Sequence, residues 1–111
     1  MEKTYYNTAD LRKFGKVTEW QEEVGNKFFD WYGEVFKDGH LTAKEKSLIA
    51  LAVSHAVQCP YCIDAYTEES IKKGFSEGAM MEAVHVAAAI RGGASLVHGV
   101  QMMNKAKKLN V

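Results

Sequence analysis

The chain has 111 residues and equal numbers of acidic and basic side chains, 14 of each, so its formal net charge is zero. A chain of this length forms one domain, residues 1–111, and buries roughly 65% of its unfolded surface, which is enough for a hydrophobic core. Zero net charge excludes strong attraction to nucleic acid or an acidic membrane. The first residues are polar, and no apolar run approaches the roughly 20 residues that span a bilayer. These features predict a cytoplasmic protein without membrane partners.

The first half of the chain predicts helices. Residues 5–14 show no clear period and predict irregular chain with room for one short helical turn. Apolar side chains at spacings of three and four then predict an amphipathic helix over residues 20–36, ended by Gly39 and His40. Its aromatic side chains are expected in the core or at an interface, or alternatively beside a substrate pocket. Thr42 and Glu45 predict a capping box before a helix that is apolar on most sides and therefore buried or sandwiched between neighbours.

Pro60, the only proline, predicts a boundary between two helices. Proline has no amide hydrogen to donate, so the preceding helix is expected to end around residues 58–60. Proline is also favoured in the first turn of a helix, so a new helix is expected to begin near Cys59 and to end at Gly74. Ser76 is the expected cap of the helix that follows.

A further break, or alternatively a tight crossing of two helices, is expected at residues 91–95, where the sequence RGGAS places two glycines together. A last helix follows, and its terminal lysines complement the helix dipole. Taken in order, the elements predict an all-α domain of five or six helices with short connections.

The two cysteines, Cys59 and Cys62, are three residues apart and flank the proline. In a reducing compartment such a pair is typical of redox chemistry or of half a metal site. Cys62 is expected in the first turn of a helix, where free amides and the helix dipole lower the pKa of a thiol. Oxidation of one thiolate to a sulfenic acid would let the other condense with it to a disulfide, and the spacing alone leaves open which sulfur attacks first.

Two other interpretations of the pair stay open. The cysteines can be small buried residues without chemistry. Alternatively, on a continuous helix His55, Cys59 and Cys62 would share one face and could bind zinc or copper, although a structural zinc site needs a fourth ligand from elsewhere. His55 is in addition a candidate general base, or a hydrogen-bonded histidine packed between helices.

The run Leu41–Ser95, which includes KSLIALAVSHAVQCPYC, resembles the carboxymuconolactone decarboxylase-like family and, within it, the AhpD-like alkylhydroperoxidase branch. The resemblance implies an all-α AhpD-like helical bundle, assembly into homo-trimers or homo-hexamers, and thiol-dependent peroxidase activity without a cofactor. It also implies that Cys62 attacks the hydroperoxide substrate, that Cys59 resolves the product, and that a thioredoxin- or lipoyl-type dithiol is the reductant. The segment CPYCIDAYT is similar to a peroxidase-like subgroup associated with arsenosugar biosynthesis.

The chain departs from the family pattern at the two positions of its proton relay. Ser47 stands where the family has a glutamate, and Tyr66 stands where it has a histidine. The two hydroxyls could hydrogen-bond to each other or to a water, but a tyrosine with a pKa near 10 is a poor base. Glu45 lies about 200° around the helix from the relay position, so His55 is the best candidate base. A metal- or metalloid-binding accessory protein using the same thiols and a non-catalytic structural oligomer are the alternative functions.

Overall fold

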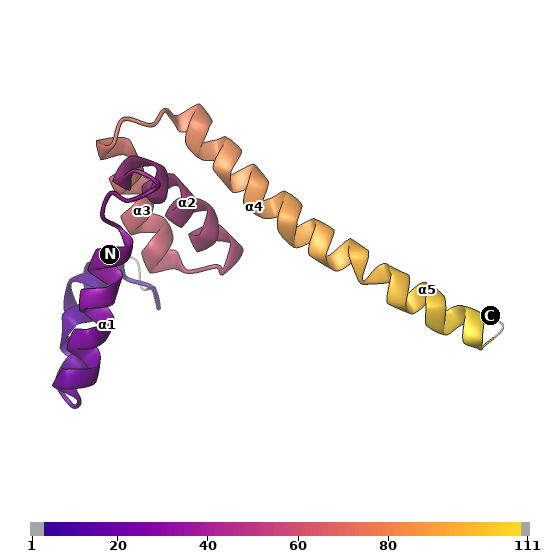
Figure 1. Cartoon of the computed structure of the whole chain (residues 1–111), viewed down its shortest axis with the longest axis horizontal. Helices are drawn as coiled ribbons and strands as arrows, with labels where there is room; N and C mark the ends of the chain where they lie inside the picture. The colour runs from indigo at the N-terminus through magenta and orange to yellow at the C-terminus, as the bar shows by residue number, and fades with distance from the viewer. Residues whose placement is uncertain (1–3, 110–111) are drawn as a thin grey trace.

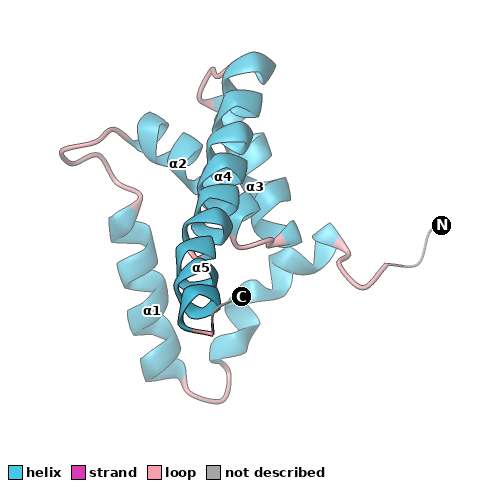
Figure 2. Cartoon of the chain, turned by 90° about the vertical axis from the view of Figure 1, so that its right-hand side faces the viewer, coloured by secondary structure: helices cyan, strands magenta, loops and turns pink. Residues whose placement is uncertain are grey.

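A computed structural model describes residues 4–109, and in this range the chain forms helices and no strand (Figures 1 and 2). This confirms the all-α fold predicted from the hydrophobic spacing. The elements in order are the 3-10 helix η1 (Thr8–Thr18) and the α-helices α1 (Glu22–Val35), α2 (Ala43–Ala56), α3 (Pro60–Lys72), α4 (Glu77–Val97) and α5 (Gly99–Lys108).

The N-terminal region is more regular than predicted. Residues 5–14 are predicted as irregular chain with room for one short helical turn, whereas the structure forms η1 over Thr8–Thr18, which begins where the Asn7 side chain accepts a hydrogen bond from the amide of Ala9 at 3.0 Å. The following helix begins at Glu22, so Trp20 lies in the turn before α1. The two helices pack against each other closely at Gly25, where an added Cβ would lie 2.3 Å from the Thr18 side chain. The close approach explains why α1 has a glycine in its first turns.

Helices α2, α3 and α4 form the central part of the molecule. The predicted capping box is present: the Glu45 amide donates to Thr42 Oγ1 at 3.0 Å, and the Thr42 amide donates to Glu45 Oε1 at 2.9 Å. Helix α2 packs against both α3 and α4, which confirms the sandwiched position expected from its composition. Its Leu51 is 1% exposed and is the largest fully buried side chain within residues 4–109.

Helix α4 passes straight through residues 91–95, so the predicted break there is wrong. Glycine in a helix interior costs only about 1 kcal/mol relative to alanine, and the neighbouring alanines favour the helix. No atom outside the helix lies within 4 Å of the Cβ position of Gly92 or Gly93, so no tight crossing occurs there. The helix ends instead at Val97, with His98 as its cap residue, and α5 continues nearly in line with α4 (Figure 1).

The first part of α4, which contains the buried Met80, Ala83 and Ala87, packs against α2, whereas the later part of α4 continues into α5 as an arm that projects from the other helices (Figure 1). The radius of gyration is 19.0 Å, whereas a compact chain of this length has about 13 Å. The exposed surface is 9048 Å², against about 6,100 Å² for a compact monomer of this mass. Large apolar side chains of the arm are exposed, among them Ile90, Leu96, Val97, Met102 and Met103. None of the helices in residues 4–109 is long and apolar enough to cross a membrane.

Candidate active site

The cysteine pair lies at the junction of α2 and α3. Helix α2 ends at Ala56, and Gln58 then adopts φ 56°, a left-handed conformation that non-glycine residues rarely take. This turn allows the Cys59 amide to donate to the Ser54 carbonyl at 3.0 Å. Pro60 is the first residue of α3, as predicted from its missing amide hydrogen.

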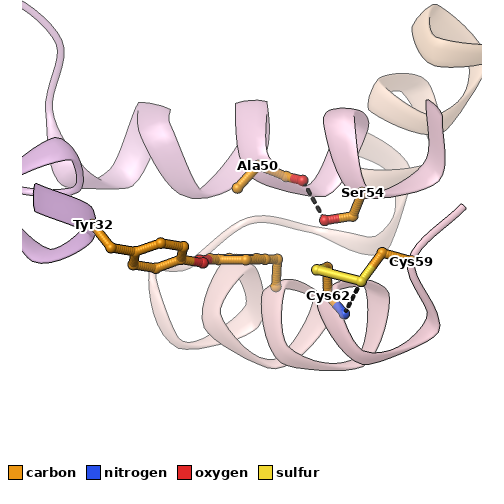
Figure 3. Close-up of a disulfide and its surroundings, with 6 residues drawn as sticks. Tyr32, Ala50, Ser54, Cys59 and Cys62 are labelled. Carbon is orange, nitrogen blue, oxygen red and sulfur yellow. Dashed lines mark hydrogen bonds between the residues drawn. A yellow bond between two sulfur atoms is a disulfide. The ribbon is translucent and has the colours of Figure 1, made fainter. Parts of the chain in front are cut away.

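Cys59 and Cys62 form a disulfide with their Cα atoms 5.2 Å apart (Figure 3). Cys59 is the N-cap of α3, and its sulfur accepts the amide of Cys62 at 3.3 Å. Cys62 lies in the first helical turn, as expected. An amide directed at the Cys59 sulfur would also stabilise a thiolate there after reduction, so the helix dipole favours negative charge on either sulfur. Both residues are half-buried and therefore within reach of small molecules in solution.

An apolar cavity of about 420 Å³ opens beside Cys62. It lies between the end of α1, the middle of α2 and the start of α3, and Cys59 is not among its lining residues. Lys46 is the charged side chain at its edge, and its Nζ donates to the Lys37 carbonyl at 2.5 Å. The apolar lining consists mainly of Val35, Phe36, Leu41, Ile49, Ala50, Val53 and Val57. Such a lining favours an apolar organic ligand over a charged one.

The two relay positions, Ser47 and Tyr66, are not hydrogen-bonded to each other. Ser47 is 2% exposed, and its Oγ donates to the Lys44 carbonyl at 2.7 Å. The Tyr66 hydroxyl shares a hydrogen bond with the hydroxyl of Tyr32, in which either phenol can donate. Burial and this hydrogen bond raise the pKa of Tyr66 well above its ordinary value of 10.0, so the phenol stays neutral at physiological pH.

Tyr32 is the site residue that the family pattern does not single out. It lies on α1, 34 residues before Tyr66, and its side chain points between α2 and α3 toward the disulfide (Figure 3). Phe36 stacks on Tyr66 with ring centroids 5.4 Å apart. Tyr32 and Phe36 both line the cavity that contains Cys62, in agreement with the alternative prediction that aromatic residues of this helix lie beside a substrate pocket. Nothing in their spacing distinguished them from the other aromatic residues of α1.

His55 takes a position that differs from the one a continuous helix would give it. The helix is interrupted between His55 and Cys59, because α2 ends at Ala56 and α3 begins at Pro60. His55 therefore does not share one helix face with the two sulfurs. The ring Nδ1 lies 2.8 Å from the Leu51 carbonyl, and His55 does not line the cavity with Cys62. Within residues 4–109 no three His, Cys, Asp or Glu side chains are grouped so that they could hold a metal ion.

Comparison with known proteins identifies the family. The model of the carboxymuconolactone decarboxylase family matches residues 22–105, so the chain belongs to this family. It is 44% identical over 84 residues to a Paracoccus denitrificans protein described as "Uncharacterized protein 4 in cox locus", with 76% of each chain covered. A crystal structure of a protein from Methanobacterium thermoautotrophicum has 36% sequence identity and a TM-score of 0.74, covering 78% of this chain and 97% of that one.

Proposed function

We propose that the protein is a thiol-dependent peroxidase of the AhpD-like type, or a closely related dithiol–disulfide oxidoreductase, that acts on apolar organic hydroperoxides. The observation that carries the proposal is the asymmetry of the two sulfurs. Cys62 lines the apolar cavity, whereas Cys59 is not among the lining residues and is joined to Cys62 by the disulfide. A substrate in the cavity would therefore meet Cys62 first, and Cys59 would be placed to resolve the product.

The reaction divides into three balanced steps. The Cys62 thiolate attacks the distal oxygen of the hydroperoxide; an S–O bond forms, the O–O bond breaks, and the alkoxide leaves with the electron pair and takes a proton. The Cys59 thiolate then attacks the sulfenic sulfur, forming the disulfide and releasing hydroxide, which is protonated to water. A thioredoxin- or lipoyl-type dithiol finally reduces the disulfide by exchange and is itself oxidised to a disulfide.

The tested quantity is the number of free thiols per chain before and after one equivalent of cumene hydroperoxide. The reduced protein should lose two thiols, and dithiothreitol should restore both. Cys59→Ser should react once and stop as a sulfenic acid that dimedone traps, because its resolving sulfur is absent. Cys62→Ser should consume hydroperoxide no faster than a free cysteine; wild-type consumption by this variant would overturn the assignment of the attacking sulfur.

His55 has weaker support as the general base, because its Nδ1 is engaged by its own helix. Its role stays a prediction, and the rate of thiol oxidation in the variant His55→Gln tests it. If His55 activates Cys62, the variant should slow thiol oxidation about 10²-fold near neutral pH. An unchanged rate would leave His55 a packed, hydrogen-bonded residue.

We further propose that the chain assembles with copies of itself, as a homo-trimer or homo-hexamer. The support is the apolar surface of the α4–α5 arm, where Leu96 is 82% exposed and Val97 is 62% exposed. Surfaces of this kind are stabilised by a partner subunit. Light scattering should give three or six times the chain mass, Leu96→Lys should lower it, and the polar control Gln101→Lys should not. A wild-type protein of monomer mass would contradict the proposal.

A further inference from the structure

The Tyr32 and Tyr66 phenols stand at the boundary between two cavities of different character. The first is the apolar cavity that contains Cys62. The second, of about 390 Å³, has a mixed lining in which Ser47, Glu69 and Lys73 add polar groups beside apolar residues; as the more polar of the two it is named the polar cavity. Both tyrosines line both cavities, so their shared hydrogen bond lies where the apolar space meets the polar one.

The packing fixes this boundary. Phe36 stacks on the Tyr66 ring at 5.4 Å and lies 5.0 Å from the Tyr32 ring, so both phenols are held by the same aromatic side chain. The Tyr32–Tyr66 hydrogen bond and this stacking join the end of α1 to α3. Either phenol can donate in the bond, so reversing the two O–H directions moves one proton from one side of the pair to the other.

We propose that the Tyr32–Tyr66 pair is a proton relay that carries a proton from the polar cavity to the alkoxide formed beside Cys62. The inference rests on the proposed peroxidase function and adds to it the source of the proton. Tyr66 is the catalytic donor, and Tyr32 positions it and returns the proton.

The proton balance closes without a further reactant. When the O–O bond breaks, Tyr66 gives its hydroxyl proton to the alkoxide oxygen and accepts the Tyr32 proton. Tyr32 recovers a proton from water in the polar cavity, and the hydroxide that remains diffuses into solvent. The transfer is downhill because an alkoxide resembles hydroxide, whose conjugate acid has a pKa of about 15.7. The charged groups that face the pair are Lys46 in the apolar cavity and Glu69 and Lys73 in the polar one.

The choice of oxidant separates proton donation from packing. A leaving alkoxide needs a proton, whereas the carboxylate that leaves from peracetic acid does not, because its conjugate acid has a pKa near that of a side-chain carboxyl, about 4. Tyr66→Phe should slow single-turnover oxidation of Cys62 by cumene hydroperoxide about 10²-fold and leave oxidation by peracetic acid within about threefold. Tyr32→Phe should slow the first reaction about fivefold, the effect of one hydrogen bond.

Tyr5→Phe is the matched control, since Tyr5 is 86% exposed and lines neither cavity; both of its rates should equal those of the wild type. If Tyr66→Phe slows the reaction equally with both oxidants, the tyrosine has a packing role and the relay is overturned. Unchanged rates with both oxidants would also overturn the relay. In either case a reactive wild-type protein would leave the peroxidase proposal standing. A wild-type protein that is inert to both oxidants would instead overturn the peroxidase function, and the relay with it.

Discussion

Restoring the family's relay residues at two positions gives a test of how the site is built. The double variant Ser47→Glu with Tyr66→His places a carboxylate and an imidazole where the family has them. Both parent residues line the polar cavity, so the new side chains can meet there. Ser47 is 2% exposed, however, so its substitution alone introduces a buried carboxylate without a partner.

The expected free energies follow from this burial. An uncompensated buried charge destabilises a protein by about 3–5 kcal/mol, so Ser47→Glu alone should lower the free energy of unfolding by that amount at pH 7. Two opposite charges about 4 Å apart attract by about 4 kcal/mol at an effective dielectric constant of 20. The loss of the Tyr32–Tyr66 hydrogen bond is common to Tyr66→His and the double variant and cancels in the comparison, so a favourable coupling of about 1–3 kcal/mol is expected between the two substitutions.

Urea unfolding of the wild type, both single variants and the double variant measures this coupling directly. The destabilisation by Ser47→Glu should shrink as the pH falls toward 5, because burial raises the pKa of the new carboxyl and the neutral form is less costly. The double variant should also oxidise with cumene hydroperoxide about 10²-fold faster at pH 7 than either single variant. Additive free energies, within about 0.5 kcal/mol, would refute the reasoning that places the two positions in one polar cavity.

Three further predictions concern stability. Thr42→Ala should destabilise the protein by about 1 kcal/mol at pH 7 by removing the cap of α2. The backbone amide of Thr42 and, second, its hydroxyl donate to the Glu45 carboxylate and hold the pKa of Glu45 below its ordinary value of 4.5. The substitution removes only the hydroxyl's share, which is present above pH 4.5 and is lost as the pH falls through the lower folded-state pKa, so denaturation at pH 7 and pH 3 should show the difference between the two proteins narrowing. Leu51→Ala should lower the free energy of unfolding by about 2–5 kcal/mol, seen as a lower urea midpoint. A smaller loss would mean that neighbouring side chains move into the space that the leucine side chain leaves. Gly74→Ala should cost about 1 kcal/mol because φ is 95°, although its Cβ would meet no neighbour within 4 Å; an unchanged thermal midpoint would contradict this.

The sequence predicted the helix boundaries best where the signal is local. The Thr42 capping box, the start of α3 at Pro60, and the end of that helix at Gly74 each depend on residues a few positions apart. Caps and proline effects act within one helical turn, so no distant contact is needed to read them. The glycines at residues 92–93 were misleading because glycine only lowers helix propensity, and the flanking alanines outweigh it.

Local spacing predicted only the two sulfur atoms of the site; Tyr66 was indicated by the family resemblance, and Tyr32 was found only in the structure. The spacing of Cys59 and Cys62 and their position at a helix start followed from three residues of sequence. The apolar cavity needed α1, α2 and α3 to be placed together, and with it came the difference between the two sulfurs.

The amino-acid sequence by itself determined the all-α class, the break at Pro60 and the paired cysteines, because each arises from neighbours along the chain. The tertiary structure alone decided that Tyr66 hydrogen-bonds to Tyr32 and not to Ser47. The two tyrosines are 34 residues apart, and no local pattern fixes the angle at which α1 meets α3. Side-chain packing across that junction, through Phe36, sets which hydroxyl groups meet.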